Sequence, residues 1–310
     1  MRTSRKILVP ILLGTLGLVA ASCGDDDDDA GDTPTPPEGP ALVIGAQDFG
    51  ESAILGEVYG QALSNAGYAV TQQALGGFRD IVFTSFESGD INFTAEYAAS
   101  ALEFLNGDET EATGDIDETM TAFTARLAER GLQPFAASPA VDSNSFVVTA
   151  ETAERLNLSK VSDLTPDLRL GGPPDCPDNA SCIPGLIETY GLDLSANFVP
   201  LDGGGPLTVA ALDGGEIDVA ILFSTDGVIA DKGWVVLEDD KGLINADNIV
   251  PVTTDAVVEA YGDDLAALVD SVSEALSTEE LTEMNRQFNV DKLDAKKIAT
   301  TWLESEGLLG

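Results

Sequence analysis

Residues 86–97 read FESGDINFTAEY and residues 212–223 read LDGGEIDVAILF, two segments that align without a gap at an offset of 126 positions. Each ends a helical pattern with glycine and enters an apolar run that closes on an aromatic residue, Tyr97 or Phe223. Glycine is favoured just after a helix, and an apolar run is typical of a parallel strand buried on both faces. The repeat predicts two α/β lobes whose strands end on facing aromatic residues, where open α/β sheets bind ligands.

The first 23 residues have the composition of a bacterial export signal. A basic start precedes an apolar run over residues 7–21, which is shorter than the roughly 20 residues that span a bilayer. The segment LVAASC, residues 18–23, resembles the lipobox of bacterial lipoproteins, with Ala20 where leucine is more common. The resemblance implies that Cys23 is lipidated and becomes the mature N-terminus. An ordinary secreted protein with an incidental cysteine is the alternative.

Residues 24–40 are predicted to form a tether. Five consecutive aspartates precede a proline-rich stretch, and such a segment cannot bury a core and stays extended. The export signal, the lipidated cysteine and the tether together predict an extracytoplasmic protein. We expect a lipid anchor to hold it on the outer face of the cell membrane.

Two cysteines remain once Cys23 is assigned to the anchor. An even number of cysteines in an exported chain suggests a disulfide, which would join Cys176 to Cys182 and close a small loop. A metal site is not expected, because the sequence contains no histidine and a single CxxxxxC pair offers too few ligands.

Composition also bears on the class of function. The formal net charge of −39 excludes nucleic acid as a partner, because a phosphate backbone needs basic patches. The chain has no histidine, no free cysteine outside the predicted pair, no phosphate-binding loop and no serine–base pair that we can assemble. We therefore expect a binding protein without a cofactor, and not an enzyme.

Residues 41–310 are long enough for two lobes of ordinary domain size. We assign residues 41–141 and 253–310 to the first lobe and residues 142–252 to the second. The patterns after residue 254 are helical and amphipathic, and these helices are expected to return to the first lobe. Helix, glycine and strand also follow one another by chance in α/β proteins, so the spacing of the repeat alone leaves that alternative open.

Several short segments carry a resemblance to a known family: IGAQDFGE (44–51), ILGE (54–57), GDIN (89–92) with EY (96–97), PGL (184–186), YGL (190–192), GEID (215–218), FSTDG (223–227) and VLEDDKG (236–242). In combination they resemble the substrate-binding lipoproteins of ABC importers for quaternary-amine osmolytes such as glycine betaine, carnitine and choline. The resemblance covers essentially all of residues 41–310. It implies a type II periplasmic-binding-protein fold, in which two α/β lobes close a hinged cleft on one small ligand. It also implies a monomer that delivers this ligand to an ABC permease.

In that family the cationic head of the ligand lies in a box of aromatic side chains. Ring faces suit a trimethylammonium group, which cannot donate strong hydrogen bonds. The resemblance places Tyr97 in this box, and Phe223 at a position that is usually tyrosine. It places Asn144 where another aromatic residue can stand, with Phe146 on the same strand face. The last box tyrosine aligns with Asp247.

The basic residues that hold a ligand carboxylate in this family are also missing. Gln47 and Asn179 stand where lysine and arginine can occur, whereas Ser100 keeps a hydroxyl group. Because two positive charges are absent and Asp247 adds a negative one, a ligand carboxylate would be repelled and poorly solvated. We therefore expect a cationic ligand without a carboxylate, such as choline.

Other interpretations stay open. The protein could bind carboxylated osmolytes such as glycine betaine or proline betaine, or be a surface lipoprotein that kept the fold and lost the ligand. Individual residues also have plainer alternatives. Tyr97 could pack in the core, and Asp247 could lie in an exposed turn. Arg79 could reach the cleft, but a lone arginine more often forms a surface or hinge ion pair. Trp234 and Trp302 are expected to pack in the core or at the surface.

Overall fold

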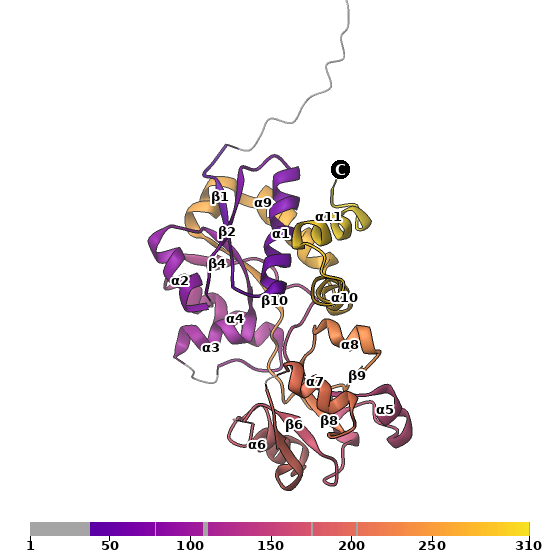
Figure 1. Cartoon of the computed structure of the whole chain (residues 1–310). Helices are drawn as coiled ribbons and strands as arrows, with labels where there is room; N and C mark the ends of the chain where they lie inside the picture. The colour runs from indigo at the N-terminus through magenta and orange to yellow at the C-terminus, as the bar shows by residue number, and fades with distance from the viewer. Residues whose placement is uncertain (1–37, 78, 108–110, 175, 203, 310) are drawn as a thin grey trace, which may run out of the picture. The chain divides into compact units, whose positions relative to one another are not determined.

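The computed structural model describes residues 38–77, 79–107, 111–174, 176–202 and 204–309. The predicted export signal, the lipidation site Cys23 and residues 24–37 of the predicted tether lie outside the described residues. The described residues belong to one compact unit. This unit contains two five-stranded sheets, each with its own set of helices (Figure 1).

The first sheet has the strand order β2-β1-β3-β10-β4. Its strands are β1 (Leu42–Ala46), β2 (Val70–Ala74), β3 (Phe93–Tyr97), β4 (Leu132–Pro134) and β10 (Ile249–Thr254). The helices of this lobe are α1 (Gly50–Asn65), α2 (Arg79–Ser88), α3 (Ala98–Asn106), α4 (Ile116–Ala128), α9 (Asp255–Ala275), α10 (Thr278–Asn289) and α11 (Ala295–Ser305). The three C-terminal helices all contact α1, so the chain returns to the first lobe as predicted (Figure 1).

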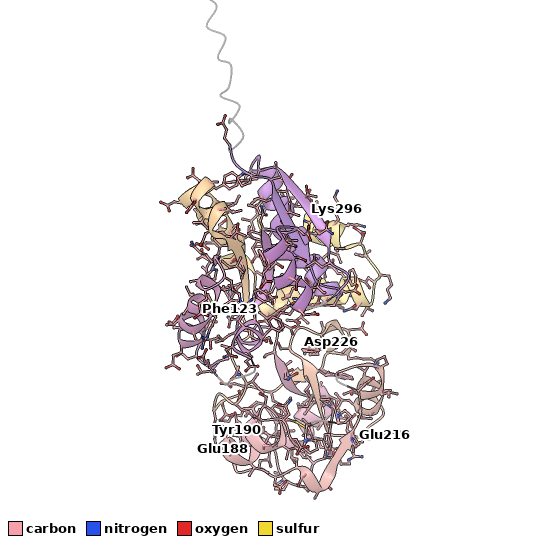
Figure 2. The ribbon with its side chains drawn as sticks, turned by 90° about the vertical axis from the view of Figure 1, so that its left-hand side faces the viewer. Phe123, Glu188, Tyr190, Glu216, Asp226 and Lys296 are labelled. Carbon is pink, nitrogen blue, oxygen red and sulfur yellow. A yellow bond between two sulfur atoms is a disulfide. The ribbon has the colours of Figure 1, made fainter. Side chains whose placement is uncertain are left out.

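The second sheet has the strand order β7-β6-β8-β5-β9. Its strands are β5 (Asn144–Val148), β6 (Leu170–Gly172), β7 (Phe198–Pro200), β8 (Val219–Phe223) and β9 (Val235–Val236). Its helices are α5 (Ala150–Leu156), α6 (Ile183–Gly185), α7 (Pro206–Asp213) and α8 (Gly227–Lys232). A π-helical turn over Leu186–Tyr190 extends α6, and Glu188 and Tyr190 of this turn are labelled in Figure 2.

The sequence repeat is also a repeat of structure. In the first sheet Ile44 of β1 pairs with Phe93 of β3, and in the second sheet Leu170 of β6 pairs with Val219 of β8. Leu170 follows Ile44 by 126 positions, and Val219 follows Phe93 by the same 126 positions. Strands β2 and β7 keep this offset in their pairing with β1 and β6. Residues 42–97 and residues 168–223 are therefore two copies of one strand-helix-strand-helix-strand unit, which we call the first and the second copy.

The repeated strands β3 and β8 lie in the middle of their sheets. Each is parallel to one neighbour, β1 or β6, and antiparallel to the other, β10 or β5. The prediction of a parallel strand is therefore right for one neighbour and wrong for the other. The reason is the crossing of the chain between lobes. Strands β10 and β5 each begin after a crossing, beside the residues where β3 and β8 end.

The predicted boundary between residues 252 and 253 needs a correction. Strand β10 begins at Ile249 and pairs with β3 and β4 of the first sheet. Residues 249–252, assigned above to the second lobe, therefore belong to the first. An apolar strand pattern does not reveal which of two sheets the strand joins, so the sequence could not place this boundary.

Capping residues in the sequence explain where several helices begin. Asp115 precedes α4, and its Oδ1 atom accepts hydrogen bonds from the backbone N–H groups of Asp117 and Glu118 at 2.9 and 3.1 Å. Ser277 and Glu280 form a reciprocal capping box at the start of α10. Such caps satisfy N–H groups that have no partner within the helix, and each stabilises the fold by about 1 kcal/mol.

The sequence patterns over residues 256–262 and 265–276 predict two helices. The structure agrees, because α9 consists of two helices that meet at Gly262, whose backbone is not helical, with φ of 61°. A left-handed residue of this kind is readily adopted by glycine. None of the described helices is both long enough and apolar enough to cross a bilayer.

Apolar clusters fill both faces of each sheet. The largest fully buried side chains include Tyr59, Phe93 and Phe123 in the first lobe and Phe146 in the second. Trp302 belongs to a core cluster of the first lobe, and Trp234 to one of the second. Each lobe therefore has its own core, and the residues between the two sheets are left to form a site.

Candidate ligand-binding site

A cavity of about 570 Å³ lies at the ends of β3 and β8 and is lined by residues of both lobes. The lining residues are Gln47, Phe49, Gly50, Glu51, Arg79, Tyr97, Ser100, Asp142, Phe223, Thr225, Asp226, Asp247, Asn285 and Asn289. Its volume is in the range of small-molecule sites. The cavity brings together five of the residues that the sequence singles out: Gln47, Tyr97, Ser100, Phe223 and Asp247.

Glu51, near the start of α1, is the centre of the hydrogen bonding in this cavity. Its Oε1 atom accepts a bond from the hydroxyl of Tyr97 at 2.7 Å. Its Oε2 atom accepts bonds from the hydroxyl of Thr225, at 2.6 Å, and from the side-chain amide of Asn285 on α10. Thr225 follows β8 of the second lobe, so the bond between Glu51 and Thr225 joins the two lobes.

Asp142, on the segment between β4 and β5, lies beside Glu51. Burial and the nearby negative charge of Glu51 raise the pKa of Asp142 well above its ordinary value. Burial also raises the pKa of Glu51, although the hydrogen bonds from Thr225, Tyr97 and Asn285 oppose this. Two adjacent carboxyl groups in a buried site do not both ionise easily, so a cation bound beside them would favour their ionised forms.

Arg79 supplies a positive charge to the cavity, but this charge is already paired. Its Nε atom lies 3.0 Å from Oε2 of Glu96, a residue of β3 whose side chain is completely buried. Burial raises the pKa of Glu96 and the nearby guanidinium of Arg79 lowers it. The side-chain amide of Gln47 donates to the other Glu96 oxygen at 3.5 Å. Both residues are thus engaged with Glu96 as well as exposed to the cavity.

Asp247, in the segment between β9 and β10, is only 8% exposed. Its side chain accepts hydrogen bonds from the backbone N–H of Ser100, at 3.0 Å, and from the Ser100 hydroxyl. The helix α3 has no cap from its own N-cap side chain, Tyr97, and Asp247 supplies the missing acceptor from a distant part of the chain. Burial raises the pKa of Asp247 to about 6, against the hydrogen bonds from Ser100.

Three aromatic rings line the cavity. The rings of Phe49 and Tyr97 have centroids 6.1 Å apart. Phe223, at the end of β8, is 49% exposed, which is unusual for a large apolar side chain and leaves its ring accessible. A cation lying between these rings would meet aromatic faces from both copies of the repeated unit.

Two residues that the sequence singles out are not among the lining residues. Asn144 pairs with Phe223 between β5 and β8 but is exposed, and Phe146 is buried in the core of the second lobe. Asn179 accepts a hydrogen bond from the backbone N–H of Ser181 at 2.9 Å, within the loop closed by the disulfide. The bonded cysteines of this loop, Cys176 and Cys182, have Cα atoms 5.2 Å apart.

Several lining residues were given no role from the sequence. Phe49, Glu51, Thr225 and Asp226 all stand inside the segments that carry the family resemblance, and this was a signal that could have found them. Asp226 (labelled in Figure 2) is the N-cap of α8 and accepts a hydrogen bond from the N–H of Val228 at 3.0 Å.

The two lobes also meet directly, next to the cavity. Helix α8 of the second lobe contacts α10 of the first. Its first residue is Gly227, and a Cβ atom placed there would lie 2.4 Å from the Cα atom of Arg286 on α10. The last glycine of the FSTDG segment is therefore required by the close approach of two backbones.

A second cavity, of about 560 Å³, lies along α10 and α11 of the first lobe. It contains none of the predicted site residues and has an acidic edge formed by Glu279, Glu280 and Glu283. Among the described residues no group of three or more cysteine, aspartate or glutamate side chains is arranged to hold a metal ion.

The fold and the first cavity define a binding protein whose two lobes enclose one small solute. Residues 40–305 match the OpuAC family, described as the substrate binding domain of the ABC-type glycine betaine transport system, and the chain belongs to this family. The resemblance that the short segments carry is thereby confirmed. The chain is the substrate-binding protein of an ABC transporter for solutes of the betaine, carnitine and choline type, and it is not an enzyme.

Individual relatives span almost the same length. The glycine betaine-binding protein YehZ of Escherichia coli (strain K12) is 24% identical over 278 residues, which cover 86% of this chain and 90% of that protein. The glycine-betaine-binding protein of Pseudomonas aeruginosa is 26% identical over 288 residues, 86% of this chain and 88% of that protein. A crystal structure of a glycine betaine/carnitine/choline ABC transporter superposes with a TM-score of 0.78 at 24% identity, over 87% of this chain and 100% of that one. The type II periplasmic-binding-protein fold is confirmed.

Proposed function

We propose that the protein is a monomeric lipoprotein that captures a small organic cation without a carboxylate, of which choline is the best example, and passes it to an ABC permease. The observation that carries the proposal is the charge of the cavity lining. Four acidic residues, Glu51, Asp142, Asp226 and Asp247, line the cavity, whereas the guanidinium of Arg79 is paired with Glu96.

This lining suits a cation in two ways. The rings of Phe49, Tyr97 and Phe223 each contribute about 0.5–2 kcal/mol when a cation lies over their faces. The buried carboxyl groups add attraction in a site where water does not screen them well. A ligand carboxylate would instead meet Asp247 and the Glu51–Asp142 pair, and would lose charge-assisted hydrogen bonds of about 1.5–3 kcal/mol each.

A carboxylated ligand such as glycine betaine is the second candidate, because one observation favours it. Arg79 lines the cavity, its side chain is 22% exposed, and its Nε atom makes the bond to Glu96. The terminal nitrogens of the guanidinium could then hold a carboxylate. The names of the relatives from Escherichia coli and Pseudomonas aeruginosa, which mention glycine betaine, also favour this candidate.

Calorimetric titration of the purified protein with choline, tetramethylammonium and glycine betaine distinguishes the two candidates. We expect choline to bind more tightly than glycine betaine. Tight binding of glycine betaine without binding of choline would reject the proposal. If none of the three compounds binds or raises the melting temperature, the protein would instead be a surface lipoprotein that lost its ligand.

A matched pair of variants tests the contribution of the ring. Phe223→Leu removes the aromatic face and keeps an apolar side chain, so choline affinity should fall about tenfold. Phe223→Tyr restores the residue that is usual in the family and should bind choline as well as the original protein. Equal affinity of the two variants would remove Phe223 from the site.

Anchoring at Cys23 is the remaining part of the proposal, and it rests on the lipobox resemblance alone. In a bacterium that expresses the full chain, the protein should fractionate with the membrane. The Cys23→Ser variant should be released into the soluble extracytoplasmic fraction. Membrane association that is the same in both would contradict a lipid anchor at this residue.

A further inference from the structure

Two acceptor atoms on residues that line the cavity have no hydrogen-bond donor among the described residues. They are Oδ1 of Asp142 and Oδ1 of Asn285, and both are buried. Buried acceptors in native proteins are nearly always satisfied, so an exception calls for an explanation. Both residues line the cavity, which makes a ligand the natural source of the missing donors.

The orientation of Asn285 is fixed by its neighbours. Its Nδ2 atom donates to Oε2 of Glu51 and to the backbone carbonyl oxygen of Thr225, the latter at 2.9 Å. Since a carbonyl oxygen can only accept, the amide cannot be turned over without losing its bond to Thr225. The Oδ1 atom therefore points away from Glu51 and stays without a donor, on a residue that is only 4% exposed.

Asp142 has a partner on one side only. The backbone N–H of Thr225 reaches its carboxyl group, and Oδ1 is left without a donor. A cation bound beside Asp142 and Glu51 favours their ionised forms, in which each carboxylate oxygen is a hydrogen-bond acceptor.

We infer that the ligand donates hydrogen bonds to Asp142 and Asn285, so that the site selects a cation carrying an O–H or N–H group over a fully alkylated ammonium ion of similar size. The inference rests on the proposed function, because it specifies which kind of cation the cavity takes. A trimethylammonium head fits the rings but has no donor. A hydroxyl two carbons away, as in choline, or an N–H on the cationic centre itself would supply one.

The test compares choline with its methyl ether, (2-methoxyethyl)trimethylammonium. The two ions have the same charge and the same trimethylammonium head, and they differ in one O–H donor. In calorimetric titrations of the unmodified protein, the ether should bind at least about tenfold more weakly. Equal affinities would overturn the inference and leave the proposed function standing. If neither ion binds, the proposed function fails and the inference fails with it.

A pair of variants then locates the acceptor. In Asp142→Asn the side-chain oxygen is expected to turn toward Thr225, which places an NH₂ group where Oδ1 was. In Asp226→Asn the cavity loses the same charge, but Oδ1 of Asp226 already has its donor, Val228. The ratio of the choline affinity to the ether affinity should fall toward one in Asp142→Asn and stay unchanged in Asp226→Asn. The same ratio in both variants would show that Asp142 acts through its charge alone, against the inference.

Discussion

The two copies of the repeated unit share a backbone but not a chemistry. The first copy brings Gln47, Glu51, Arg79 and Tyr97 to the cavity, whereas the second copy contributes Phe223 at the end of its last strand. At the offset of 126, the positions of Gln47, Glu51 and Arg79 are occupied by Pro173, Pro177 and Gly205. The difference teaches that the strand register sets where a site can form, and that the loops and helix starts decide which lobe holds the ligand.

The contrast extends into the core. Glu96, inside β3, is fully buried and ion-paired, and the equivalent position in β8 is the buried Leu222. In the first lobe the buried carboxylate of Glu96 therefore orients the side chains of Arg79 and Gln47. The second lobe has an apolar strand there and acts as the surface that closes on the ligand.

Replacing Glu51 with alanine should have the largest effect. The change leaves Tyr97, Thr225 and Asn285 without their shared acceptor and removes a bond between the lobes. We expect a loss of choline affinity of about 100-fold or more, and a fall of about 3 kcal/mol in the free energy of unfolding. Urea denaturation and calorimetry measure the two effects.

The control is the equivalent position of the second copy, Pro177, which is exposed. Pro177→Ala should change the free energy of unfolding by no more than about 0.5 kcal/mol. If the two substitutions had similar effects, the chemistry of the site would not be concentrated in the first copy.

Replacing Arg79 with leucine should destabilise the first lobe. The change leaves Glu96 buried without a charged partner, and breaking such a pair lowers the free energy of unfolding by about 3 kcal/mol. The double variant Arg79→Leu with Glu96→Leu gives β3 the apolar residue of the second copy and should recover most of this loss. A double variant as unstable as the single one would mean that Glu96 is needed for more than its pairing.

Replacing Gly227 with alanine should weaken ligand binding about tenfold without affecting the core of either lobe. The added methyl group would collide with the backbone of α10 at Arg286 and hold the lobes apart. The control is Gly214→Ala, because the first copy has Ser88 at the equivalent position and already accommodates a Cβ atom there. Equal affinities of the two variants would show that the α8–α10 contact is not part of closure.

The smallest expected effect is a dependence of affinity on pH. Burial raises the pKa of Asp247 to about 6 and also raises the pKa values of Asp226, Asp142 and Glu51. A cation binds the ionised forms better, so choline affinity should rise by a few fold between pH 5 and about pH 7, with release of protons. Calorimetry in two buffers of different ionisation enthalpy measures that release. Affinity that falls as the pH rises would contradict the assignment.

The same shift has the opposite sign for folding. A carboxyl group whose pKa is raised in the folded state contributes stability that is present below its unfolded pKa and is lost as the pH rises through the folded value. For Asp247 this window runs from about pH 4 to about pH 6. The empty protein should therefore become less stable over the same range in which it gains affinity for a cation.

The fold could largely be predicted from the sequence, because the two copies of the repeat have similar strand sequences at a constant offset of 126 residues. Tyr97 and Phe223 were found from the repeat alone, and Gln47, Ser100 and Asp247 from the family resemblance, and all five line the cavity. Asn144 and Asn179 do not, because an aligned position fixes the strand or the loop but not the direction in which its side chain points.

The remaining features of the site depend on contacts between residues far apart in the chain, which no local sequence pattern reveals. Asn285 reaches Glu51 across 234 positions of the chain, through the return of the C-terminal helices. The sequence leaves two possibilities for Arg79, a position in the cleft or a surface or hinge ion pair. The structure combines the cleft with an ion pair, since Arg79 lines the cavity and is paired with the buried Glu96. A spacing of 17 residues between a helix start and a strand does not reveal that the two side chains meet.

The close approach of Gly227 to α10 bears on how a permease could distinguish the ligand-bound protein from the empty one. Two backbones that touch without a side chain between them have no flexible atoms to absorb a partial fit. We therefore expect the two lobes to close in an all-or-none manner. A solute that keeps the lobes slightly apart would lose the whole contact between α8 and α10. The outer surface that a permease meets would then have one closed shape, whichever solute is inside, and discrimination among solutes would be completed before docking begins.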